Sequence, residues 1–216
     1  IRQLSSAGFS ASVSLTTQLQ RLENLELVIG NASLKGRLER ESAEGQAPSL
    51  SIDLAGNEID LDALKAIGGL VMGEQGDSSI SQHRMAARFK ADRFNVSGVT
   101  ANEVETAFSV DNGVLNVEKL TAGDVAGAQL DANARLEGSL LNYAGKGTVS
   151  LRAADPQPFL AMLQKHLPGH PILQRMLDSA SWYVNSDLKA DLSIGSENEG
   201  MSVALSGTVN GSRISA

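Results

Sequence analysis

The residues whose types and spacing could support chemistry are few. In the segment His166-Leu-Pro-Gly-His170, the spacing could bring two imidazoles to one metal ion. Pro168-Gly169, however, interrupts the helical pattern between the two histidines, and no third ligand is apparent in the sequence. We therefore expect His166 and His170 to be polar residues at a corner between two helices, and we predict no metal site.

The other candidates for catalysis have simpler structural explanations. Asp60 and Asp62 could form an acid pair, but a carboxylate near the start of a helix also caps its free N–H groups. The glycine-rich segment 68–79 ("GGLVMGEQGDSS") lacks the Lys-Ser/Thr of a phosphate loop. There is no Gly-x-Ser-x-Gly elbow and no cysteine that could act as a nucleophile. The sequence thus predicts no catalytic residue and no cofactor, and we expect a protein that is not an enzyme.

Composition and charge further restrict the class of protein that this chain can belong to. The 216 residues are 42% hydrophobic, which is enough for a substantial core in one or two domains. The net charge is −7 and the basic residues are scattered, which excludes the basic stripe of a nucleic-acid-binding protein. No apolar run approaches the roughly 18 residues that span a bilayer. Because the chain starts at Ile1 and its last stretch still resembles a strand, we interpret it as a piece of a longer protein whose targeting or anchoring segments lie elsewhere.

Most of the chain alternates apolar and polar residues with period two, as in residues 84–91 ("RMAARFKA"). This pattern predicts antiparallel strands in a sheet with one face in water. Two segments have helical patterns instead: a short helix at about residues 60–68, and a helical pair at about residues 156–180 that Asp155 can cap. We therefore expect a mainly β fold with a few helices.

The stretch "FSVDNGVLNVEKL" shows how such strands should pair. Asn112-Gly113 is a signal for a two-residue hairpin turn, because both residues tolerate the positive φ angles that a type I′ turn requires. Folding the chain at this turn pairs Val110 with Leu115 and Phe108 with Val117, and partners in a hairpin lie on one face. A protein core, a partner protein or a bound lipid could each require that apolar face.

The sequence also contains a weak internal repeat, with an offset of roughly 95–99 residues. Three matches occur in the same order: 32–39 with 131–138, 50–64 with 149–163, and 87–92 with 186–191. We predict a first β repeat over residues 1–110 with its short helix, and a second over 111–216 with the helical pair; the alternative is that both belong to one continuous domain.

The predicted strands outnumber the elements that could cover them. The sequence predicts about a dozen amphipathic strands but only about three short helices. A stacked core is roughly 10 Å thick and covers the whole face of a sheet, which so few helices could not do. The sheet must therefore curl onto itself or hold something else against its apolar face. For any single residue, an ordinary core remains the alternative explanation.

Two stretches resemble the AsmA-like family of Gram-negative envelope proteins, which includes TamB and YhdP. They are "LSIDLAGNEIDLDALKAI" and "FKADRFNVSGVTANEVETAFSVDNGVLNVEKLTAGDVAGAQLDANARLEG", and the similarity covers about residues 20–212. The resemblance implies a long curled antiparallel sheet with a concave apolar face, in a periplasmic region that an N-terminal helix anchors in the inner membrane. The residues that would line the implied groove are Phe89, Val104, Phe108, Val110, Leu115 and Val117.

The resemblance implies a non-enzymatic protein that binds lipid acyl chains for phospholipid transport between the inner and outer membranes and for outer-membrane homeostasis. Its partners would be phospholipid or other lipid acyl chains, with other envelope proteins as further candidates. The alternative is a scaffold or interaction domain that assists outer-membrane protein assembly, filling the face with its own side chains and pairing partners at its edges. A carbohydrate-binding domain is a third alternative with less support. Such a domain should expose aromatic platforms, and the sequence offers few candidates, namely Trp182, Tyr183 and Tyr143.

Overall fold

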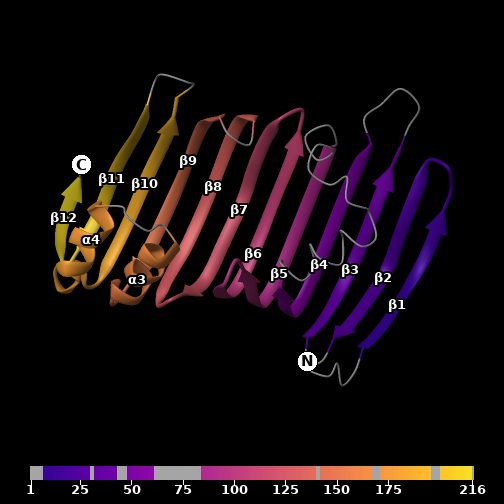
Figure 1. The fold of residues 1–216 in the computed structure, drawn as a ribbon, viewed down its shortest axis with the longest axis horizontal. Helices are drawn as coiled ribbons and strands as arrows, with labels where there is room; N and C mark the ends of the chain where they lie inside the picture. Colours follow the sequence, from indigo (N-terminus) through magenta and orange to yellow (C-terminus); the bar gives the residue numbers. More distant parts are fainter. Residues whose placement is uncertain are drawn as a thin grey trace.

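The computed structural model describes residues 7–29, 32–42, 48–60, 84–139, 142–166, 171–195 and 200–215. These residues form one open sheet of twelve strands in which every strand lies beside its neighbours in the sequence (Figure 1). The sheet does not close, so β1 and β12 are its two edges. The prediction of a mainly β fold is confirmed. The strands are β1 (Ala7–Leu15), β2 (Leu19–Ile29), β3 (Ala32–Glu41), β4 (Ser49–Asp60), β5 (Arg84–Val96), β6 (Val99–Asp111), β7 (Val114–Val125), β8 (Ala128–Ser139), β9 (Asn142–Ala153), β10 (Ser186–Ile194), β11 (Met201–Val209) and β12 (Ser212–Ser215).

Helices interrupt the described strands between β9 and β10. They are α3 (Gln157–His166), α4 (Pro171–Asp178) and a short 3₁₀ helix, η2 (Ala180–Tyr183). The Asp155 carboxylate accepts a hydrogen bond of 2.9 Å from the Gln157 backbone N–H, so it caps α3 as the sequence predicts. The predicted helical pair is therefore confirmed. The other predicted helix, at about 60–68, lies outside the described residues except for Asp60, which is the last residue of β4.

The hairpin between β6 and β7 has the predicted register. Phe108 lies opposite Val117 and Val110 lies opposite Leu115. The turn residues Asn112 and Gly113 have φ angles of 49° and 77°, the positive values that a type I′ turn requires. The backbone geometry of two residues thus determines which side chains of the two strands share a face.

One pair of strands corrects the prediction of a wholly antiparallel sheet, because β4 and β5 are parallel. Ser49 at the start of β4 lies beside Arg84 at the start of β5, so the two strands run in the same direction. The corresponding strands of the second predicted repeat, β9 and β10, are antiparallel. The two halves therefore differ in topology, and the fold does not confirm the repeat; the sheet also continues across the predicted boundary at residues 110 and 111 through the β6–β7 pair.

The buried residues form two clusters along the sheet. The first joins β2 to β5 and includes Leu54, Ile59 and Phe89. The second joins β6 to β9 with α3, through residues that include Val104 and Phe159. Because partly buried Phe94 packs against both clusters, the two form a continuous layer of apolar contacts.

Gly36 in β3 offers a direct test of how closely the strands pack. A Cβ atom at this position would lie 1.9 Å from the Asp53 carbonyl oxygen, whereas one at Gly8 in β1 would have nothing within 4 Å. We expect Gly36→Ala to lower the free energy of unfolding by about 2–3 kcal/mol, because the β3–β4 pair must separate to admit the methyl group. Gly8→Ala should change it by less than about 0.5 kcal/mol. Urea denaturation of both variants measures the difference, and equal midpoints would contradict the observed β3–β4 spacing.

Candidate functional site

The strand register places nearly all the large apolar side chains of the sheet on one side. Residues that pair across strands share a face, and residues alternate between faces along each strand. Tracing the pairs from β1 to β12 defines what we call the apolar face. Its large side chains are Phe9, Val13 and Leu15 on β1; Leu22, Leu25 and Leu27 on β2; Leu34 and Leu38 on β3; Leu50, Ile52 and Leu54 on β4; Met85 and Phe89 on β5; Val104, Phe108 and Val110 on β6; Leu115, Val117 and Leu120 on β7; Leu130 and Leu136 on β8; Val149 and Leu151 on β9; Leu188, Leu192 and Ile194 on β10; Val203 and Leu205 on β11; and Ile214 on β12.

Bulges preserve this arrangement where the sequence does not alternate. Leu22 and Leu25 are separated by two polar residues, yet they pair with Leu38 and Gly36, which lie on the same face of β3. Asn24, inside this interruption, has a φ angle of 49°. A bulge adds one residue to a strand, and it thereby returns the following side chains to the face that they would otherwise leave.

The six predicted groove residues all lie on the apolar face, on the central strands β5 to β7. Phe89 and Val104 are buried, with exposed fractions of 8% and 4%, while the other four are half-buried. The rings of Phe89 and Phe108 lie 6.2 Å apart between centroids, a normal separation for a packed aromatic pair. The register brings the six residues together as predicted; that they contact lipid stays a prediction.

Helix α3 covers one end of the apolar face. Phe159 of α3 packs in the cluster that contains Ala122, Ala128 and Ala153, near the ends of strands β7 to β9. Figure 1 shows α3 and α4 at this same end of the sheet. Elsewhere on the face, Leu54 and Phe89 are among the buried side chains, but six large apolar side chains are exposed in the described structure. They are Phe9, Val13, Leu15, Leu120, Ile194 and Val203.

The opposite face, which we call the polar face, carries charged side chains in complementary pairs. Positions that lie directly opposite one another on neighbouring strands repeatedly combine a base with an acid, and such pairs stabilise a sheet. These pairs are Arg21–Glu39, Glu26–Lys35, Arg37–Asp53, Asp53–Arg88, Glu58–Arg93, Lys90–Glu105 and Asp187–Arg152. The polar face thus suits water, and the apolar face does not.

Residues of β7 to β10 line a depression of about 680 Å³ that we call the polar hollow. Its polar lining side chains lie mostly on the polar face, and the residues between them, such as Val117 and Leu192, belong by register to the apolar face.

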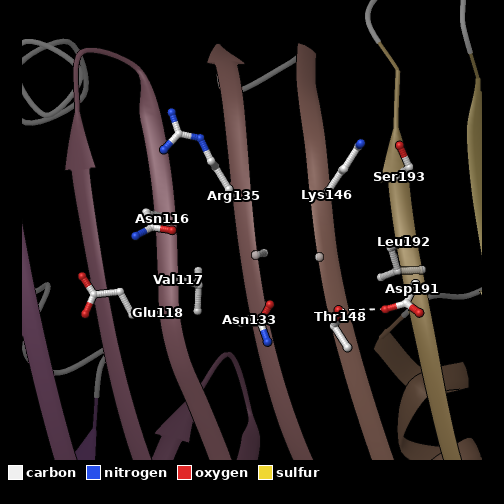
Figure 2. Close-up of a pocket in the computed structure, with 12 residues that line it drawn as sticks. Asn116, Val117, Glu118, Asn133, Arg135, Lys146, Thr148, Asp191, Leu192 and Ser193 are labelled. Carbon is white, nitrogen blue, oxygen red and sulfur yellow. Dashed lines mark hydrogen bonds between the residues drawn. The ribbon is translucent and has the colours of Figure 1, made fainter.

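Figure 2 shows the side chains of the hollow, with Arg135 and Lys146 on neighbouring strands and Asn133 and Thr148 further along the same two strands. The Thr148 hydroxyl donates a hydrogen bond of 2.9 Å to the Asp191 carboxylate. The sequence alone does not reveal this site, since its residues come from four strands and no local motif connects them.

The residues first considered for catalysis do not form a site in the described part of the chain. His166 is exposed at the end of α3, whereas His170, Asp62 and segment 68–79 lie outside the described residues. The described residues contain no group of three histidine, aspartate or glutamate side chains placed to hold a metal ion. None of their helices is long and apolar enough to cross a membrane.

By its fold, the chain belongs to the class of open, single-sheet β proteins with one apolar and one polar face. No protein-family model matches the sequence, and neither the curated proteins nor the solved structures contain a match.

The charge pairs of the polar face predict the titration of Glu105. The Lys119 ammonium lies 2.8 Å from the Glu105 carboxylate, and this hydrogen bond together with its charge lowers the pKa of Glu105, with Lys90 a smaller cause. A lowered pKa means that the pair stabilises the fold at neutral pH and that this contribution is lost as the pH falls through the pKa of folded Glu105. NMR titration should show the pKa rising in Lys119→Gln, and rising less in Lys90→Gln. Equal shifts in the two variants would contradict this geometry.

Proposed function

We propose that this chain is a non-enzymatic segment that binds lipid acyl chains along its apolar face. The observation that carries the proposal is the register itself, which places apolar side chains on one face of all twelve strands. At about 4.8 Å per strand, that face is roughly 50 Å wide. Leu54, Phe89 and Val104 on this face are buried, whereas large apolar side chains on β1, β7, β10 and β11 are exposed. Exposed apolar patches on soluble proteins mark surfaces that bind something apolar.

The energetics of such a surface suit transfer better than permanent storage. Covering apolar surface yields about 0.8 kcal/mol for each methylene removed from water. An acyl chain that leaves a bilayer, however, is already out of water, so its exchange onto the apolar face changes the free energy by much less than its full transfer from water. The apolar face would therefore hold a chain against escape into water and still release it to a membrane.

The polar face and the helices define how a lipid would sit. The acyl chains would lie on the apolar face, and a headgroup would remain in water at an open edge. The other face of the same strands carries paired charges and would not take up acyl chains. Helix α3 occupies one end through Phe159 and would close the path there. In this proposal the sheet is concave on its apolar side, and Phe89, Val104, Phe108, Val110, Leu115 and Val117 form the middle of the groove.

The biological setting that we propose rests on the sequence resemblance to the AsmA-like family. The chain would be part of a periplasmic protein that an N-terminal helix outside this segment anchors in the inner membrane. Phospholipid would move along the groove between the inner and outer membranes, with other envelope proteins as further partners. The support for this setting is the pattern of "FKADRFNVSGV" and the strands that follow it.

A second candidate function, an interaction domain that assists outer-membrane protein assembly, is favoured by the edge strand β1. Among the described strands it pairs on one side only, and its sequence "AGFSASVSL" has no charge and no proline. Edge strands usually carry such residues because they prevent pairing with other chains. Phe9 and Leu15, 64% and 71% exposed, would continue the apolar face onto an added strand.

Leu120 and Thr121 provide a matched test of lipid binding, because they are neighbours in β7 that lie on opposite faces. Leu120 is 38% exposed, so Leu120→Glu should leave the sheet folded while placing a charge on the apolar face. Native mass spectrometry should detect phospholipid with the purified wild-type protein and with Thr121→Lys, whose charge lies opposite Glu105 and Asp131 on the polar face. It should detect at least about tenfold less with Leu120→Glu, since a buried charge is costly.

Circular dichroism establishes that both variants are folded. Wild-type protein that is free of lipid, and that takes up none from phospholipid vesicles, would rule out the lipid-binding function and leave the interaction domain as the better candidate. Equal amounts of bound phospholipid in the two variants would indicate that the lipid binds away from the apolar face.

A further inference from the structure

One pair of residues departs from the charge pattern of the polar face. Wherever two charged residues lie directly opposite each other on the described strands, one is acidic and the other basic, except at Arg135 and Lys146. These two basic residues face each other across β8 and β9. Like charges at opposed positions destabilise a sheet, so the pair works against the fold in the absence of a ligand.

The neighbours of this pair do not neutralise it. On the outer side of Arg135 the register places Asn116, and on the outer side of Lys146 it places Ser193, so the row across four strands contains no carboxylate. Glu137 lies 3.1 Å from the guanidinium of Arg135, but Lys146 forms no ion pair with any described residue. The row therefore keeps a net positive charge in a protein whose total charge is −7.

The basic pair also borders the polar hollow, which gives a ligand room to bind. Figure 2 shows the two basic side chains diverging from neighbouring strands, with space between them. Opposed Cβ atoms lie about 5 Å apart, so both side chains can rotate onto one anion. The hydroxyl and amide groups of Asn116, Asn133, Thr148 and Ser193 line the same hollow and can hydrogen-bond to a polar ligand.

The hollow contains two carboxylates, Asp191 and Glu118, and Figure 2 shows both of them away from the Arg135 and Lys146 side chains. The Asp191 carboxylate accepts the hydrogen bond from Thr148 and lies 3.8 Å from the Lys189 ammonium. Glu118 belongs to the bulge in β7 and comes from the opposite side of the hollow from Asp191. An anion at Arg135 and Lys146 would thus meet two cations, of which Arg135 also pairs with Glu137, and several neutral donors.

We propose that the polar hollow binds a phosphate group carried on a hydroxyl-rich ligand. Arg135 and Lys146 hold the phosphate, since a guanidinium and an ammonium form strong charge-assisted hydrogen bonds to its oxygens. Asn133 and Thr148 contact the hydroxyl groups of the ligand. Arg135 and Lys146 lie on the face opposite the apolar face, so their binding of phosphate can be tested separately from lipid binding there.

Isothermal titration calorimetry at low salt, with glucose 6-phosphate and glucose as probes, tests the proposal. Wild-type protein should bind glucose 6-phosphate and not glucose. Lys146→Gln and Arg135→Gln should each weaken binding about tenfold or more, because each removes one charged donor. Lys119→Gln, on the same face but outside the hollow, should bind as the wild type does.

Urea denaturation supplies a second readout that does not depend on a measurable affinity for one sugar. Without ligand, Lys146→Gln should raise the unfolding midpoint, since it removes the repulsion from Arg135. With 10 mM inorganic phosphate, the wild-type midpoint should rise more than that of Lys146→Gln. No binding by the wild type in either assay, or equal weakening in Lys119→Gln, would overturn the proposal.

A phospholipid headgroup could supply the same phosphate chemistry as a free sugar phosphate. Dihexanoyl phosphatidylglycerol below its micelle concentration separates the two sources. Binding of this lipid that Lys146→Gln weakens would identify a headgroup as a ligand of the hollow. If Lys146→Gln weakens the binding of glucose 6-phosphate alone, the source is a soluble phosphate, and if it weakens neither, the hollow is not a phosphate site.

Discussion

The structure depends on one constraint, which is that the strand register must keep its phase across the whole sheet. Side chains alternate with period two, so a slip of one residue in any strand would turn its leucines and valines into water and its charges onto the apolar face. The bulges at Leu22–Leu25 and Val117–Leu120 supply the extra residue that the sequence contains at each place. The apolar face is continuous because these local irregularities occur where the alternation breaks.

The same constraint gives the two faces different requirements. On the polar face, opposed acids and bases satisfy one another, and exposed pairs of this kind add little stability individually but specify the register collectively. On the apolar face, burial supplies the stability, and in the described structure α3 covers one end while Phe9, Leu15 and Val203 are exposed. Leaving this apolar surface in water is costly, and the surface extends along the whole sheet. This is the physical basis for proposing that lipid binds to it.

Much of the strand pairing and of the two faces could be predicted from local sequence, and some of it could not. The β6–β7 hairpin followed from Asn112-Gly113, and the face shared by Phe108 and Leu115 followed from the turn. The parallel pairing of β4 with β5 could not be foreseen, because alternation is the same in either strand direction. Alternation also says nothing about which polar residues become opposed, so the basic pair of Arg135 and Lys146 emerged only from the register of β8 with β9.

Leu115 and Val114 allow the most direct measurement of the central claim, because they are adjacent in β7, lie on opposite faces, and Val114 does not line the polar hollow. A photo-crosslinking amino acid can replace each residue in turn, and the protein can then be irradiated in the presence of phospholipid vesicles and analysed by mass spectrometry. Lipid bound along the apolar face predicts a phospholipid adduct from position 115 and none from position 114. Equal adducts from both positions, or no adduct from position 115 in a folded protein, would contradict it.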